Sequence, residues 1–255
     1  MGKVLAVVSQ KGGVGKTTTA VNLGAAFARR GLKTLLVDVD PQGAIRYGVG
    51  LRSVQPALGL SDFLSGDRAL REVILPTALP WLRVILAGTV SNQATQTTYH
   101  ELIAETNLLS DLMSTARERC HVVVVDTPPG LGDVVHRVLE ASQHVVVPLQ
   151  AEPLALQTTP QILRAIQEIA SRNEELTLDG LILTMYDASN PSCVRVAEYV
   201  RQHMPRAMVF ETVVPRSQPL AEAFSAGQPL VLRDPADPAS RAYIALAEEL
   251  MERMR

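Results

Sequence analysis

The chain has few cysteines, few aromatic residues and no long hydrophobic run. Its 255 residues include only two cysteines, Cys120 and Cys193, which are far apart and form no Cys-x-x-Cys pair. This count argues against a zinc or iron–sulfur site within one chain and fits a reducing compartment. No apolar stretch approaches the ~18 residues of a membrane-spanning helix, and residues 1–3 lead into a strand pattern rather than a signal peptide. We therefore expect a soluble, cytoplasmic protein.

An excess of positive charge is also missing. The sequence has 24 Lys and Arg against 26 Asp and Glu, a formal net charge of −2 and a pI near 6.2. A protein of this charge has no global field that attracts nucleic acid, so any such binding requires a local basic patch. Hydrophobic residues make up 47% of the chain, enough for a full core. The simplest interpretation is one α/β domain over residues 1–255, although two domains are compatible with this length.

One glycine-rich segment, residues 11–18, organises what the sequence does contain. It follows an apolar run over residues 3–8 and precedes a helical pattern over residues 17–30. A strand, a glycine-rich loop and a helix form a phosphate-binding P-loop, because backbone N–H groups and the helix dipole face the anion. The candidate nucleotide-binding residues of the loop are Gly12, Gly13, Val14, Gly15, Lys16, Thr17 and Thr18.

The charged and hydroxyl side chains of this loop have predictable roles. Lys16 can reach the β- and γ-phosphates, and the Thr17 hydroxyl can bind Mg²⁺. The general pattern G-x-x-x-x-G-K-[ST] has its first glycine where this chain has Gln10, so the loop is a variant. It carries a second lysine instead, Lys11, at a position from which a side chain points away from the phosphates of its own subunit.

Acidic residues follow two of the predicted strands. Residues 33–39 form an apolar run that contains Asp38 and is followed by Asp40, and the valine-rich run over residues 121–125 ends at Asp126. In open α/β sheets, ligands bind at the carboxyl ends of the strands. We therefore expect Asp38 and Asp126 to hold Mg²⁺ through water and Asp40 to orient or deprotonate the attacking water.

Strand and helix patterns alternate along the rest of the chain. This alternation predicts a doubly wound α/β fold, a mostly parallel sheet of about seven or eight strands with helices on both faces. Residues 46–80 contain only short helical patterns, at 60–64 and 67–74. The further strands are expected at 81–86, 144–148, 178–185 and 207–214, and the further helices at 99–119, 153–172, 192–203 and 238–254.

Several motifs together carry a family resemblance. They are residues 11–18, Asp38-Val39-Asp40-Pro41-Gln42-Gly43, Asp126-Thr127-Pro128-Pro129, Met185-Tyr186-Asp187 and Val214-Pro215-Arg216. Taken as a set, they resemble the ParA/MinD family of deviant Walker A ATPases, in particular the small Soj-like ParA partition ATPases without an N-terminal helix-turn-helix domain. The resemblance covers essentially the whole chain.

The resemblance implies a mechanism. It implies a homodimer that sandwiches ATP and Mg²⁺, binds DNA non-specifically and hydrolyses ATP slowly until a ParB-type or other adaptor protein stimulates it. The cargo, which is a plasmid, a chromosome origin or a protein assembly, is then segregated or positioned over the nucleoid. By position, Lys11 matches the lysine that crosses the dimer interface to the phosphates of the partner. Glu152 resembles an acid that contacts the ribose across the dimer, and Met185 and Pro215 resemble a wall for adenine.

Two departures from the family pattern concern DNA binding. The family usually carries further arginines after Met-Tyr-Asp and after Val-Pro-Arg, where this chain has Ala188-Ser189-Asn190 and Ser217-Gln218-Pro219. Arg216 is therefore the candidate DNA contact, and fewer phosphate contacts imply weaker binding. For Met185 and Pro215, a buried methionine and a strand-ending proline are the alternative interpretation.

Three other functions share parts of this pattern. A MinD-like membrane-associated positioning ATPase would end in an amphipathic helix with a basic polar face, whereas the last predicted helix carries Glu248, Glu249 and Glu252. A small-molecule ligase or kinase would need a substrate pocket with placed polar groups, of which the sequence shows no clear set. An iron–sulfur reductase would need a cysteine where this chain has His136.

Overall fold

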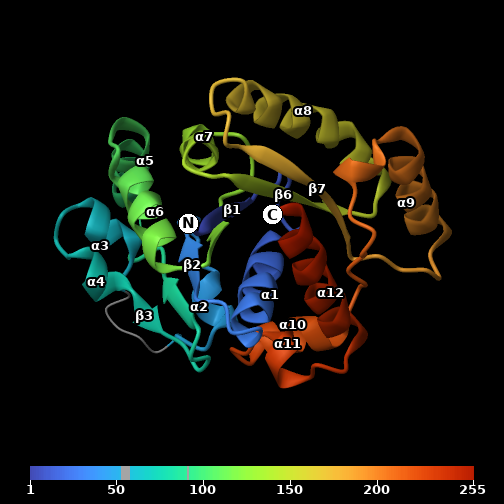
Figure 1. Ribbon diagram of the computed structural model, residues 1–255, viewed down its shortest axis with the longest axis horizontal. Helices are drawn as coiled ribbons and strands as arrows, with labels where there is room; N and C mark the ends of the chain where they lie inside the picture. The colour runs from blue at the N-terminus through green and yellow to red at the C-terminus, as the bar shows by residue number, and fades with distance from the viewer. Residues whose placement is uncertain (53–57, 91) are drawn as a thin grey trace.

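The computed structural model describes residues 1–52, 58–90 and 92–255. Within these residues, seven strands form one sheet in the order β3-β4-β2-β5-β1-β6-β7 (Figure 1). All neighbouring strands are parallel except β3 and β4. The strands are β1 Lys3–Val7, β2 Thr34–Asp38, β3 Leu75–Pro76, β4 Leu82–Ile85, β5 Val122–Asp126, β6 His144–Gln150 and β7 Thr177–Thr184. The expected doubly wound, mostly parallel α/β fold is confirmed.

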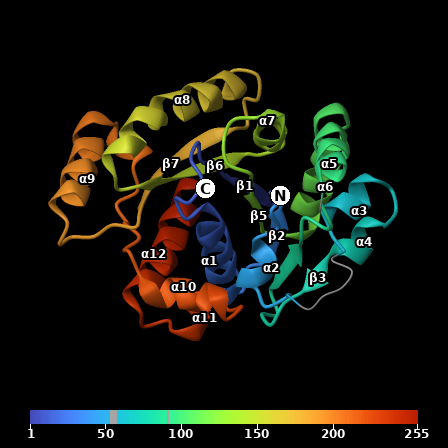
Figure 2. The same ribbon diagram turned by 180° about the vertical axis from the view of Figure 1, so that it is seen from behind.

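Helices cover both faces of the sheet (Figures 1 and 2). One face packs against α1 Lys16–Arg29, α2 Ile45–Gly48, α10 Gln218–Ser225, α11 Leu230–Arg233 and α12 Pro238–Arg253. The other packs against α3 Leu60–Leu64, α4 Leu70–Val73, α5 Gln93–Glu105, α6 Leu108–Arg119, α7 Asp133–Glu140, α8 Pro153–Ala170 and α9 Pro191–His203.

The central strands are apolar on both sides because they separate two hydrophobic cores. In β1, Val4 and Ala6 face the core under α5 to α9, and Leu5 and Val7 face the core under α1 and α12. All four side chains are fully buried. Alternate residues of a strand point to opposite faces, so a strand covered on both faces reads as a continuous apolar run.

The predicted helix over residues 99–119 is wrong in its bounds. Two helices occupy this part of the chain, and α5 begins at Gln93, six residues before the predicted start at residue 99. Asn92 is the reason, because its side-chain oxygen accepts a hydrogen bond from the Thr95 N–H at 2.9 Å and caps the helix. The helix ends where Thr106 adopts an extended backbone.

The predicted strand over residues 207–214 is also wrong. Its first residues belong to a short 3₁₀ helix, η1 Arg206–Met208. After η1, the chain forms isolated bridges, from Val209 to Leu181 of β7 and from Pro215 to Tyr186, which follows β7. The valines of this stretch gave it a strand-like pattern, but its backbone does not stay in register with β7.

The last helix, α12, packs against the sheet beside α1. Its apolar residues are buried against the face that α1 also covers. These buried residues are Ala239, Tyr243, Leu246, Ala247 and Leu250. Among the described residues, none of the helices has the length and apolar character needed to cross a membrane.

Candidate functional site

The loop between β1 and α1 has the backbone shape of an anion-binding loop. Gly13 and Gly15 have φ angles of 78° and 86°. These angles lie in the left-handed region, which residues other than glycine adopt only with strain. Gly15 is the N-cap of α1, and its carbonyl accepts the first helical hydrogen bond, from the Thr19 N–H at 2.8 Å. The positive end of the α1 dipole therefore meets the loop, which favours a phosphate group there.

Lys16 lies among buried carboxylates. Its side chain is 8% exposed, and its Nζ is 3.5 Å from Asp126 Oδ1 and 3.9 Å from Asp40 Oδ2. Asp126 is fully buried, and neither of its carboxylate oxygens has a hydrogen-bond partner within the described residues. Burial raises the pKa of Asp126, and the Lys16 ammonium opposes that rise. The sequence-predicted residues Lys16, Asp40 and Asp126 are thus brought together.

Asp38 adds a third carboxylate on the neighbouring strand. Its Oδ2 accepts a hydrogen bond from the Ile45 N–H at 3.1 Å, at the start of α2, and its Oδ1 has no partner in the described part of the chain. Burial, and next the charge of Asp126, raise the pKa of Asp38 well above its ordinary value. When all three carboxylates are ionised, the single ammonium leaves an excess of buried negative charge, which a bound cation would offset.

These residues fit Mg²⁺ as part of a larger ligand set. Mg²⁺ takes oxygen ligands and keeps several waters, and unpartnered buried carboxylate oxygens suit such a hydrated ion. Within the described residues, no group of three His, Cys, Asp or Glu side chains forms a metal site by itself. The remaining ligands would therefore come from phosphate oxygens, water and the hydroxyl of Thr17, which is the second residue of α1.

Asp40 is held by the turn that follows β2. Its Oδ1 accepts a hydrogen bond from the Gln42 N–H at 2.9 Å, and its backbone carbonyl accepts one from the Gly43 N–H at 2.9 Å. Asp40 is 7% exposed and lies on the wall of a cleft of about 550 Å³ that Pro128 and Pro129 also line. The carboxylate is therefore fixed in direction and reachable from solvent through this cleft.

A second hollow of about 240 Å³ lies on the other side of the loop. Gly15, Thr18, Met185 and Pro215 line it together with Tyr243 of α12. Met185 has a φ of 51° and is the only residue other than glycine with a positive φ among those described. The Arg216 side chain is exposed at the rim of this hollow. Met185 and Pro215 thus lie beside the phosphate loop, where a nucleotide base would extend.

Tyr243 was missed by the sequence reasoning. It is buried, its hydroxyl is 3.1 Å from Thr19 Oγ1, and burial raises its pKa to about 12. In the sequence it is one residue of an apolar helix pattern. The only available signal was a tyrosine on a buried helix face, where a hydroxyl needs a polar partner.

Lys11 and Glu152 lie on the opposite side of the loop from Met185. Lys11 is exposed, and its carbonyl accepts a hydrogen bond from Ser9 Oγ at 3.0 Å. No ion pair found among the described residues includes Lys11. Glu152 precedes α8 and accepts a hydrogen bond from Gln150 Nε2 at 2.5 Å. Both residues line one small pocket, so they share one edge of the site.

Comparisons with known proteins agree with this geometry. Residues 2–178 match a family described as an AAA domain. The chain is 36% identical over 251 residues to the sporulation initiation inhibitor protein Soj of Bacillus subtilis, with 98% of each chain covered. It is 37% identical over 256 residues to the chromosome partitioning protein ParA of Caulobacter vibrioides, and this match covers 99% of this chain and 95% of that protein.

Solved structures give the same fold. The septum site-determining protein MinD from Pyrococcus horikoshii, complexed with Mg-ADP, has a TM-score of 0.84 at 22% identity and covers 98% of this chain and 96% of its own. Cobyrinic acid a,c-diamide synthase from Mycobacterium smegmatis, with a bound ATP analogue and magnesium, has a TM-score of 0.81 at 26% identity. The match covers 100% of this chain and 96% of the synthase chain. The chain belongs to the ParA/MinD family of P-loop ATPases and is a partition or positioning ATPase.

Proposed function

We propose that this protein is an ATP-driven dimer switch that segregates DNA or positions a cargo. Two copies sandwich ATP and Mg²⁺, the dimer binds DNA non-specifically, and hydrolysis releases it. The observation that carries this proposal is the exposed Lys11, a cation at the edge of the phosphate loop for which no ion pair is found in the described part of its own chain. A partner subunit placed against that edge would bring its phosphates within reach of Lys11.

The P-loop and the three buried acids support the binding of Mg²⁺ and ATP. Lys16 and the N-terminus of α1 would hold the phosphates. Thr17 would bind Mg²⁺ directly, with Asp38 and Asp126 acting through water. When bound, Mg²⁺ supplies charge neutralisation between the phosphate oxygens. The MinD structure that shares this fold holds Mg-ADP, and the cobyrinic acid a,c-diamide synthase structure holds an ATP analogue and magnesium.

Asp40 is the group proposed to act on the attacking water. Its Oδ1 is held by the Gln42 N–H, and the carboxylate faces a cleft through which water can enter. Attack of this water on the γ-phosphorus breaks the bond to the ADP oxygen, and Asp40 orients the water or accepts its proton. Lys16 neutralises charge on the phosphate oxygens. Hydrolysis is slow in the dimer alone and is stimulated by a ParB-type or other adaptor protein.

The finer contacts of the nucleotide follow from the two hollows beside the loop. Met185 and Pro215 would form a wall for adenine, and Glu152 would contact the ribose across the dimer. Arg216, exposed at the rim, would contact DNA phosphates. A protein with these contacts would act in the cytoplasm on the nucleoid. The apolar face of α12 is buried, so a membrane-bound form would need another membrane-binding surface.

Light scattering on the wild type and two variants tests the proposal. With ATP and Mg²⁺, the wild type should form a dimer, whereas Lys16→Ala should lose nucleotide binding altogether. Lys11→Gln should bind one ATP per chain yet remain monomeric, because only the contact across the interface is removed. A Lys11→Gln protein that dimerised and hydrolysed ATP normally would overturn the switch.

The same preparation separates the other functions of this fold. ATP turnover by the wild type should rise with DNA and an adaptor protein. Turnover that rose only with a small metabolite would indicate a ligase or kinase instead, and ATP-dependent sedimentation with liposomes would indicate a membrane-associated positioning ATPase.

A further inference from the structure

The segment from η1 to Pro215 first loses register with β7 between Phe210 and Val214. The Phe210 N–H donates to Leu181 O at 3.0 Å, and the Val214 N–H donates to Leu183 O at 2.8 Å. Between such bonds, a regular parallel ladder advances two residues on each strand. Here β7 advances two residues and the segment advances four, so two residues of the segment are in excess.

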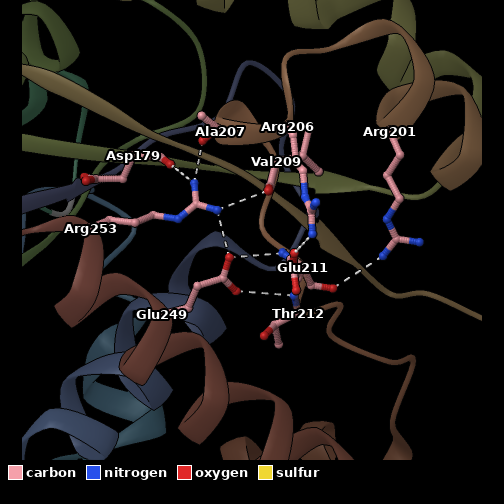
Figure 3. A network of polar contacts seen from close by, with 9 residues as sticks. All are labelled: Asp179, Arg201, Arg206, Ala207, Val209, Glu211, Thr212, Glu249 and Arg253. Carbon is pink, nitrogen blue, oxygen red and sulfur yellow. Dashed lines mark hydrogen bonds and ion pairs between the residues drawn. The ribbon is translucent and has the colours of Figure 1, made fainter.

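A side chain of α12 takes the N–H groups that this excess leaves without a strand partner. The Glu211 N–H donates to Glu249 Oε1 at 3.1 Å, and the Thr212 N–H donates to Glu249 Oε2 at 3.4 Å (Figure 3). A carboxylate is a strong acceptor for backbone N–H groups, and the bond from the Thr212 N–H is partly buried. Glu249 therefore stabilises residues 211–213, which we call the bulge, where the strand pairing does not.

Arg253, one turn further along α12, fixes the Glu249 carboxylate. Its Nη2 is 2.8 Å from Glu249 Oε1, and the two side chains are 22% and 20% exposed. The guanidinium also donates to the carbonyls of Asp179, Ala207 and Val209 at 2.5, 2.6 and 3.1 Å. It thereby joins β7, η1 and Val209, which lies just before the excess residues, to one end of α12, as Figure 3 shows.

Gly180 provides the space for this arrangement. A Cβ at this position would lie 3.0 Å from Arg253 Nη1 and 3.1 Å from Met208 O, and the φ of Gly180 is 150°. Any larger residue would push against the guanidinium. Gly180, Glu249 and Arg253 therefore pack together and depend on one another.

The bulge is directly followed by the wall of the hollow beside the phosphate loop. The Tyr186 N–H donates to Val214 O at 3.0 Å, and the Arg216 N–H donates to Tyr186 O at 2.9 Å. From Leu183 to Tyr186, the end of β7 and the residues after it advance three residues while the segment advances two. This opposite excess contains Met185, whose positive φ places it in the hollow. The conformation of residues 211–213 therefore sets which residue of the segment pairs with Leu183, and with it the position of Pro215 relative to Met185.

We infer that Glu249 is a positioning residue for the base-binding half of the nucleotide site, acting through Glu211 and Thr212 on Pro215. This inference rests on the proposed function, because it takes the hollow beside Met185 as the place of the adenine base. Glu249 touches no nucleotide in this arrangement. Its effect should appear only with ligands that carry a base, since the P-loop is formed by a different part of the chain.

Calorimetric titration with two probes tests the inference. ADP engages the loop and the base pocket, whereas tripolyphosphate engages the loop alone. In Glu249→Ala, the affinity for ADP should fall about tenfold, a modest loss for two hydrogen bonds to a charged acceptor, with the affinity for tripolyphosphate unchanged. Glu249→Gln keeps one acceptor oxygen and should lie between the wild type and Glu249→Ala.

Glu252→Ala is the matched control, because Glu252 is an exposed glutamate on the same end of α12. It should leave the affinity for both probes unchanged. Equal losses for ADP and tripolyphosphate, or an unchanged ratio of the two affinities in both Glu249 variants, would overturn the inference. A wild type that binds neither probe would overturn the proposed function instead. If Glu249→Ala does not fold, Glu249→Gln still gives the ratio.

Discussion

Asp38 and Asp126 are paired residues at the ends of the neighbouring parallel strands β2 and β5, and both are fully buried. Burial and the charge of Asp126 raise the pKa of Asp38, so the two carboxylates oppose each other when both are ionised. Such a pair costs stability in the nucleotide-free protein. This loss of stability is explained if the two carboxylates bind a cation that arrives with the nucleotide.

Asp38→Asn should therefore stabilise the nucleotide-free protein. The amide oxygen can still accept the hydrogen bond from the Ile45 N–H, while a buried charge is removed, so the free energy of unfolding should rise by about 1–2 kcal/mol. Urea denaturation measures this change. Adding ATP and Mg²⁺ should stabilise the wild type more than the variant. Asp111→Asn, which alters an exposed carboxylate of α6, should change stability little, and a destabilised Asp38→Asn would contradict the argument.

The sequence was sufficient for the parts of the site that local patterns determine. The P-loop is one continuous segment between a strand and a helix, and Asp126 directly ends the valine run of β5. Because parallel strands end at the same edge of a sheet, the meeting of Lys16, Asp40 and Asp126 could be predicted without knowing the strand order.

The sequence was insufficient where a residue acts through a distant element. The strand predicted over residues 207–214 has the right residue types, but its register depends on Glu249, which lies in α12. Tyr243 reaches the hollow beside the loop only because α12 packs against α1. Neither contact leaves a local pattern, since each depends on the packing of segments far apart in the chain.

Asp40→Ala should separate ATP binding from hydrolysis. The P-loop is unchanged by this substitution, so ATP should still bind and the dimer should accumulate, while the hydrolysis rate should fall by roughly 10²-fold or more, the usual contribution of a positioned general base. Phosphate release under saturating ATP measures the rate. Gln42→Ala is the control, because only the backbone N–H of Gln42 contacts Asp40. Hydrolysis at the normal rate in Asp40→Ala would show that another group orients the water.

Arg216→Ala should weaken DNA binding without affecting the binding of ATP. Arg216 is exposed beside Pro215, and the net charge of −2 provides no general attraction for DNA, so one phosphate contact should matter. The slope of log affinity against log salt should become shallower by about 0.9 for each DNA phosphate that the variant no longer neutralises. Filter binding of the ATP-bound protein to a non-specific duplex at several salt concentrations measures it. Arg71→Ala, which removes an exposed arginine of α4, should leave the slope unchanged. Equal slopes for Arg216→Ala and the wild type would place the DNA-binding surface elsewhere, because a protein that neutralises fewer phosphates must release fewer counterions.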